Sequence, residues 1–156
     1  CPEFVEMAAR VSGCPVWLQD LLALDLPAGR FDGVFANAVL FHLPSLAMPT
    51  VLANLCATLR PGGVLLASNP RGANEEGFAE GRYACFYDFP TWRRLVEAAG
   101  FELLDHYHRP PGKPRHQQPW LATVWRRPGS GPAAARAGAG RAVPPGGRAG
   151  ARPRRD

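Results

Sequence analysis

The chain has 156 residues, 46% of them hydrophobic, which suits one domain with a modest core. Its net charge of +5 belongs to the end of the sequence: residues 128–156 hold six arginines and one acid, which leaves twelve basic and twelve acidic residues in 1–127. We therefore expect no nucleic-acid-binding surface on the folded part. No apolar run approaches the roughly 18 residues of a membrane span and no signal peptide opens the chain, so we expect no membrane segment.

The four cysteines form no CxxC pair and have no metal-ligand spacing with histidine. We expect reduced thiols in a cytoplasmic protein, with Cys14 and Cys56 in the core and no bound metal. The first residue is Cys rather than Met, which indicates a fragment or a processed chain.

Residues 2–11 are predicted to form an amphipathic helix, because the apolar side chains recur at helical spacing along one side. Residues 14–19 are predicted to form a short strand with Asp20 at its carboxyl end. The next strand, at 31–37, is nearly continuously apolar, which is typical of a parallel strand covered on both faces.

A helix is predicted at 46–59, with Ser45 as its N-cap and a core-facing apolar stripe. Pro61-Gly62-Gly63 ends this helix and turns the chain into a strand at 64–68. Strand, helix and strand form a βαβ unit with two parallel strands. Asn37 and Ser68, which close the two strands, are therefore predicted to lie side by side at one edge of the sheet.

Residues 69–88 are predicted to be a long connection without a clear period. A helix follows at 90–99, and strands at 101–109 and 120–126 are joined without a helix, which indicates an antiparallel hairpin at a sheet edge. The composition divides the chain into a globular part, 1–127, and an Ala/Gly/Pro/Arg-rich tail, 128–156, that we expect to be disordered.

The segments Phe31–Pro44 and Leu59–Pro70 resemble the later half of the nucleotide-binding domain of class I S-adenosylmethionine-dependent methyltransferases, of the type 11 and type 25 kind. The resemblance covers about residues 1–126 and implies an α/β, Rossmann-like sheet with helices on its faces. The family's strand order is 3-2-1-4-5-7-6, and this chain carries the third to seventh strands. It lacks the glycine-rich loop after the first strand and the acidic residue after the second, so we expect the chain alone to be inactive.

The resemblance implies S-adenosyl-L-methionine as the cofactor. It places Asp20 at the adenine amino group, the Leu21 backbone amide at a neighbouring ring nitrogen, and Asn37 with Ala38 at the methionine moiety. Two structural alternatives stay open. In these, Asp20 caps a short turn at Leu21–Ala23, and Asn37 caps the turn at Ala38.

Phe41 and His42 follow the strand where the family places residues near the reacting methyl group. Phe41 is predicted to face the sulfonium by cation–π attraction, and His42 to take a proton from the acceptor. A packing phenylalanine and a histidine bonded to backbone are the alternatives. The following connection is predicted to cover an anionic or aromatic small-molecule acceptor, through Asn69, Arg71, Arg82, Tyr83 and Tyr87.

The sequence thus predicts methyl transfer to a small-molecule acceptor, with a non-catalytic Rossmann-like binding or regulatory module as the alternative. A nicotinamide-dependent oxidoreductase is disfavoured, because the single lysine, Lys113, forms no Tyr-x-x-x-Lys pair. The acceptor, the methylated atom and the oligomeric state are not readable from the residues.

Overall fold

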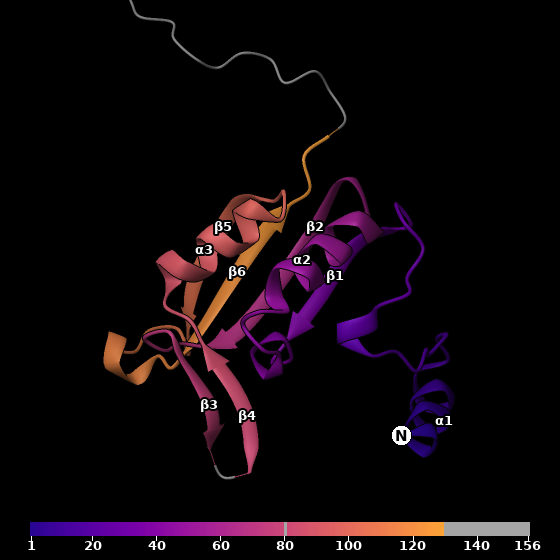
Figure 1. Ribbon diagram of the computed structural model, residues 1–156, viewed down its shortest axis with the longest axis horizontal. Coiled ribbons are helices and arrows are strands. Elements are labelled where there is room, and N and C mark those ends of the chain that lie inside the picture. Colours follow the sequence, from indigo (N-terminus) through magenta and orange to yellow (C-terminus); the bar gives the residue numbers. More distant parts are fainter. Residues whose placement is uncertain (80, 130–156) are drawn as a thin grey trace, which may run out of the picture.

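The computed structural model describes residues 1–79 and 81–129, so all but the first two residues of the predicted disordered tail lie outside the described part. The elements follow the chain order shown in Figure 1. They are α1 (Pro2–Ser12), β1 (Phe31–Asn37), α2 (Met48–Thr58), β2 (Leu59–Pro70), β3 (Glu75–Ala79), β4 (Arg82–Phe86), α3 (Phe89–Ala98), β5 (Glu102–Arg109) and β6 (Trp120–Arg126). Short 3-10 turns lie at Leu21–Ala23, Leu40–His42 and Arg115–Gln117.

The main sheet has four strands in the order β1-β2-β6-β5. β1 and β2 are parallel, whereas β6 runs antiparallel to both of its neighbours. This is the order 4-5-7-6 that the resemblance implied, with β5 and β6 as the predicted edge hairpin. Asn37 pairs directly with Ser68 in the parallel register, which confirms that these two residues lie side by side, although β2 continues two residues further, to Pro70.

The core lies between the sheet and two helices, α2 and α3, which cover the same face (Figure 1). Trp92 and Val96 of α3 are fully buried, and the Trp92 indole Nε1 donates a hydrogen bond to Thr123 Oγ1 of β6 at 3.1 Å. The predicted stripe of α2 is buried as expected, at Met48, Val51, Leu52 and Leu55.

No helix covers the opposite face of β1 in the described part, so the prediction that β1 is covered on both faces is wrong. Ala36 is buried, but Phe35 beside it is 73% exposed. Alternate residues of a strand point to opposite faces, and only one face of β1 meets helices.

The strand predicted at 14–19 is not formed, and Cys14 is exposed rather than in the core. A strand needs a neighbour that accepts and donates its backbone hydrogen bonds. Among the described strands β1 pairs with β2 alone, so nothing stands between β1 and this segment to supply such a neighbour.

Two predicted boundaries of the βαβ unit are wrong. Ser45 is not the N-cap, because the helix begins at Met48 after Ala47, and the Ser45 amide instead donates to Glu76 Oε1 at 2.8 Å. β2 starts at Leu59 rather than at residue 64, since Leu59 already pairs with Phe31 and the ladder contains an irregularity there.

Residues 69–88 are not a connection without structure but contain the antiparallel hairpin β3–β4. Its strands are short and mix charged, small and aromatic residues, so no apolar alternation marks them. The later elements are confirmed: α3 starts one residue before the predicted 90, with Asp88 as its N-cap, and β5 and β6 form the hairpin. No helix of the described residues is long and apolar enough to cross a membrane.

Candidate active site

Three polar side chains meet where β1, β2 and β5 end. The Arg109 guanidinium, at the carboxyl end of β5, donates from Nη2 to Ser68 Oγ at 2.6 Å and to Asn37 Oδ1 at 3.3 Å. Its Nε is buried and has no partner among the described residues. Ligands of open parallel sheets bind beyond the carboxyl ends of the strands, so this cluster marks the candidate site.

Ala38, directly after β1, has a φ of 58°, which is the left-handed region that few residues other than glycine adopt. Its amide donates to the Ser68 carbonyl at 2.8 Å, so the chain leaves β1 sharply while still bonded to β2. Strained backbone of this kind gathers at functional sites.

An aromatic wall stands next to the polar cluster. The Phe41 ring stacks on Phe86 at 5.8 Å and meets Trp120 edge-on at 6.2 Å, and the Arg109 guanidinium carbon lies 6.0 Å from the Trp120 ring centroid. The packing role that was the alternative for Phe41 is therefore present. Such a wall also excludes water and presents π-faces to a cation.

His42 shows the backbone bond that was the alternative for it, because its Nδ1 lies 3.0 Å from the Tyr83 carbonyl. A carbonyl only accepts, so Nδ1 carries the proton in this bond. Neutral His42 therefore keeps Nε2 as a proton acceptor, and the ring is held in one tautomer.

The β3–β4 hairpin is fastened to the segment before α2 through Glu76. Glu76 Oε1 accepts from the Ser45 amide at 2.8 Å and from the Tyr83 hydroxyl. These hydrogen bonds lower the pKa of Glu76, and the bond to Glu76 raises the pKa of Tyr83 to about 12. Tyr83 is therefore a neutral donor near neutral pH.

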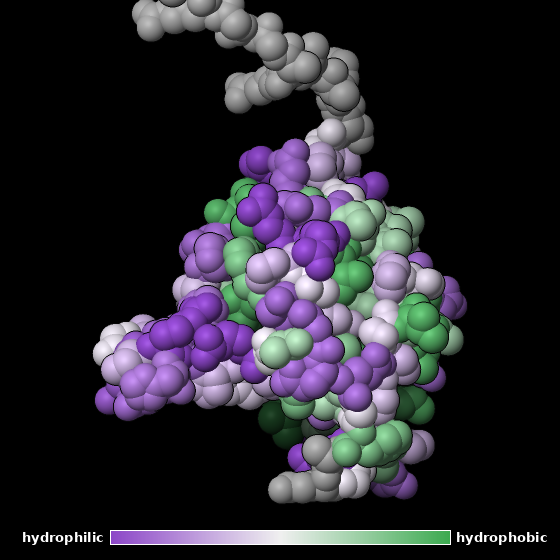
Figure 2. Space-filling model, turned by 60° about the vertical axis from the view of Figure 1, so that its left-hand side comes forward, coloured by the Kyte–Doolittle hydropathy of each residue, from purple (hydrophilic) through white to green (hydrophobic). Residues whose placement is uncertain are grey.

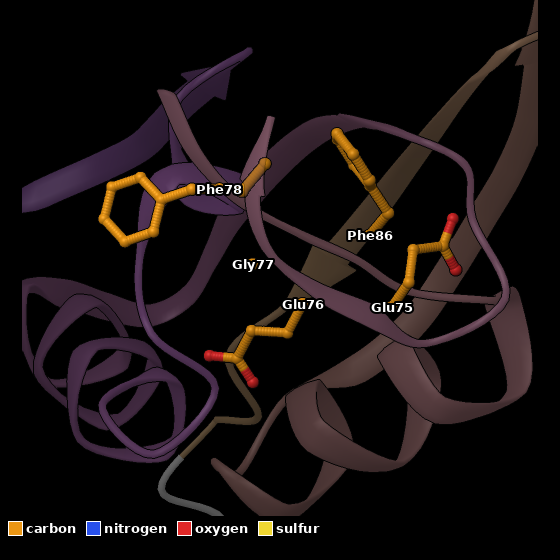
Figure 3. Close-up of a pocket in the computed structure, with 6 residues that line it drawn as sticks. Glu75, Glu76, Gly77, Phe78 and Phe86 are labelled. Carbon is orange, nitrogen blue, oxygen red and sulfur yellow. The ribbon is translucent and has the colours of Figure 1, made fainter. Parts of the chain in front are cut away.

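A pocket of about 190 Å³ opens on the hairpin, lined by Glu75, Glu76, Gly77, Phe78, Ala84 and Phe86 (Figure 3). In Figure 3 the carboxylates of Glu75 and Glu76 point away from each other, as neighbouring residues of a strand do. Ligand pockets usually span about 300–1,000 Å³, so this one accommodates part of a molecule.

The other predicted acceptor residues occupy different surroundings. Asn69 is buried, and its Oδ1 has no partner among the described residues, whereas Arg82 is exposed at the start of β4. Tyr87 is buried in the core against Trp92, and burial raises the pKa of its hydroxyl. Arg71 lies against the β5–β6 connection, where its amide donates to the Pro119 carbonyl at 2.7 Å.

Asp20 shows the capping role that was its structural alternative. Its Oδ1 accepts from the Leu22 amide at 2.9 Å and caps the turn Leu21–Ala23. Leu21 packs against the core from this turn, which fixes the exposed Asp20 carboxylate relative to the sheet.

Arg109 and Trp120 belong to the site and were missed from the sequence. The signal for Arg109 was available, because a basic residue closes the predicted strand 101–109 as Asn37 closes 31–37. Trp120 carried no such signal: its place follows from pairing with both Arg109 and Pro70 across the antiparallel strands.

The fold and the polar cluster beyond parallel strand ends define a class I S-adenosylmethionine-dependent methyltransferase domain, and similar structures agree. A crystal structure of a methyltransferase of this kind from Mesorhizobium loti has a TM-score of 0.65 at 17% identity, over 80% of this chain and 76% of that one. The Burkholderia thailandensis 1,6-didemethyltoxoflavin-N1-methyltransferase, crystallised with 1,6-didemethyltoxoflavin and S-adenosylhomocysteine, has a TM-score of 0.61 at 26% identity, over 81% of this chain and 57% of that one.

The sequence comparison is more specific. A family model described as a methyltransferase domain matches residues 3–106, and the chain belongs to that family. It is also 46% identical over 84 residues to the trans-aconitate 2-methyltransferase of Azoarcus sp. (strain BH72). That match spans 54% of this chain and 27% of the relative's length.

The residues present fit part of a site for S-adenosylmethionine, the cofactor of this class. Asp20 offers an exposed carboxylate to an amino group, and exposed Asn37 stands at the end of a parallel strand. The other long edge of β1 is unpaired among the described strands.

Proposed function

We propose that this domain takes part in methyl transfer from S-adenosylmethionine to a small-molecule acceptor. The observation that carries the proposal is the parallel pairing of Asn37 with Ser68, with the aromatic wall and His42 directly beyond it. The printed names of two similar proteins, which refer to trans-aconitate and to 1,6-didemethyltoxoflavin, support acceptors of this size.

Four positions are assigned to the cofactor. Asp20 accepts from the adenine amino group and the Leu21 amide binds a ring nitrogen, while Asn37 and Ala38 hold the methionine moiety. When bound, S-adenosylmethionine supplies a methyl group already activated on a sulfonium. The protein then has to position the acceptor and exclude water.

The acceptor is assigned to the space between the aromatic wall and the hairpin. Phe41 supplies a π-face toward a positive charge, and Tyr83 and Arg82 stand on the hairpin strand β4. His42 removes a proton through Nε2 where the accepting atom carries one. An acceptor carboxylate needs no such step, because its oxygens are already anionic at neutral pH.

The domain described here supplies one side of the cofactor pocket, and strands that pair with the open edge of β1 supply the other. We therefore expect S-adenosylhomocysteine to bind the 156-residue chain only weakly, with amide shifts at Asp20, Asn37 and Ala38 in NMR titrations. A micromolar Kd for S-adenosylhomocysteine would contradict the proposal that this chain supplies one side of the pocket alone. Amide shifts confined to other residues would contradict the four assigned positions.

Catalysis is tested by completing the sheet. A fusion of the N-terminal part of the Azoarcus relative with this chain should methylate a small acceptor. For an acceptor atom that carries a proton, His42→Ala and His42→Asn should both lower kcat about 100-fold or more and leave the cofactor Kd unchanged.

His42→Asn is the discriminating variant, because its amide nitrogen takes the place of Nδ1 and still donates to the Tyr83 carbonyl, but it accepts no proton. Full turnover of His42→Asn assigns a structural role to the histidine. A fusion that folds and binds the cofactor but methylates no acceptor favours a non-catalytic module. Cytoplasmic location is part of the proposal, and the four free cysteines support it.

A further inference from the structure

The connection between β5 and β6 carries an unusual excess of positive charge. Residues 106–119, which are this connection and the last four residues of β5, contain three histidines, two arginines and one lysine but no aspartate or glutamate. Arg71, which directly follows β2, is fastened to this connection. Its amide donates to the Pro119 carbonyl at 2.7 Å and its Nη2 to the Arg115 carbonyl at 3.0 Å.

His108 borders the same connection, because Gln118 Nε2 donates to the His108 carbonyl at 3.5 Å. Loss of solvation and then the charge of Arg71 lower the pKa of Arg115. The pKa of His108 is lowered by burial first, and then by Arg115, Arg71 and His106. Two guanidinium groups with no carboxylate between them repel each other, and a bound anion relieves this repulsion.

Among the described residues, no acidic side chain forms an ion pair with Arg71 or Arg115. The three ion pairs of the described residues involve Arg60, Arg93 and Arg126 instead. In addition, His108 Nε2 is buried without a hydrogen-bond partner among the described residues. A buried polar atom without a partner is costly, and an oxyanion that binds protonated Nε2 removes that cost.

We propose that Arg71, Arg115 and His108 form a binding site for a carboxylate group of the methyl acceptor. The site rests on the proposed function, because it places the acceptor at the end of the sheet where β1 and β2 finish. Figure 1 shows the β5–β6 connection and the β3–β4 hairpin at that same end. Figure 2 brings this side forward and shows hydrophilic residues in a lobe that stands out from the body.

The chemistry favours a small carboxylate over a polyanion. Guanidinium groups bind carboxylates through two parallel hydrogen bonds, which gives orientation as well as affinity. The patch involves only two arginines and a histidine, while residues 1–127 are neutral overall. A nucleic acid needs a wider basic surface than this.

The test is a titration of the 156-residue chain with trans-aconitate, which carries three carboxylates, without any cofactor. The proposal predicts saturable binding by calorimetry and a rise in the pKa of His108, followed through its ring NMR signals, because a bound anion favours the protonated ring. Arg115→Gln should raise the Kd about tenfold or more, and Arg115→Lys should raise it less.

Arg10→Gln is the matched control, because it removes one exposed charge from α1, at the other end of the molecule (Figure 1). It should leave the Kd within about twofold. Equal weakening by Arg10→Gln and Arg115→Gln reduces the effect to net charge and overturns the site.

Two other outcomes also overturn the proposal. One is binding that does not saturate up to about 10 mM trans-aconitate in a buffer of roughly physiological ionic strength. The other is inorganic phosphate that binds as tightly as trans-aconitate. The readout is independent of methyl transfer. A fusion that methylates nothing while Arg115→Gln still weakens trans-aconitate binding contradicts the proposed function alone.

Discussion

Helices α1 and α3 both carry an apolar stripe against a polar side, yet they have opposite surroundings. Trp92 and Val96 of α3 are buried against the sheet, whereas no residue of α1 is buried. Phe4 is 67% exposed and Val11 is 80% exposed. In Figure 1, α1 stands apart from the sheet, and α3 lies on it.

The difference shows that an amphipathic pattern predicts an apolar helix face but does not identify the element that packs against this face. The apolar face of α3 packs against β5, β6 and α2. The apolar face of α1 has no such packing partner among the described residues, and neither has the exposed face of β1 around Phe35. Residues 1–28 thus contact the packed part mainly through Trp17, Leu21 and Leu24. The chain is then fixed to the end of α2, where the Gly29 amide donates to the Ala57 carbonyl at 2.8 Å and the Arg30 amide to the Thr58 carbonyl at 2.9 Å.

The largest expected contrast comes from removing one ring on each helix. Trp92→Ala deletes a fully buried side chain and its bond to Thr123, and should lower the free energy of unfolding by about 3–5 kcal/mol. Phe4→Ala should change it by less than about 0.5 kcal/mol. Urea unfolding of both variants measures the contrast, and comparable losses would show that α1 is packed in solution.

A smaller contrast is expected from two arginines. Arg127 Nη1 donates to the carbonyls of Cys56, Ala57 and Leu59, so it closes the end of α2 and ties it to the segment that directly follows β6. Arg127→Ala should cost about 1.5–3 kcal/mol, because it removes charge-assisted hydrogen bonds to partly buried carbonyls. Arg10→Ala on α1 is the control and should leave the urea midpoint unchanged.

These contrasts also explain which parts of the fold the sequence could predict. The unit β1–α2–β2 was predictable, because local patterns and the Pro-Gly-Gly turn specify both the elements and their neighbours. The strand at 14–19 was not, because a strand exists only with a partner, and no local pattern states whether the partner is there. The β3–β4 hairpin was missed because its strands pair charged with apolar residues, such as Glu75 with Phe86 and Glu76 with Cys85, so no two-residue alternation marks them.

The residues of the candidate site also fall into those that the sequence predicts and those that it does not. Asn37 and Ser68 are predicted together because both lie at the carboxyl ends of strands that pair directly. Arg109 was missed because its side chain reaches past β6 to these two residues, and a long reach leaves no trace in local spacing. The prediction that Tyr87 contacts the acceptor is wrong for a related reason. It rests on a surface loop at residues 69–88, whereas the Tyr87 ring lies in the core.

The smallest contrast concerns two capping aspartates, Asp88 at α3 and Asp20 at the turn Leu21–Ala23. Asp88 accepts from the Thr91 amide at 2.8 Å, and this bond lowers its pKa. Because the folded pKa lies below the unfolded one, Asp88 stabilises the fold above the unfolded pKa, and this contribution is lost as the pH falls through the folded value. Asp88→Ala should therefore lower Tm at pH 7 and progressively less toward pH 3. Asp20→Ala should change Tm less than Asp88→Ala at pH 7, because the turn that it caps contains no buried residue. A pH-dependent loss as large as that of Asp88→Ala would show that this turn folds cooperatively with the sheet.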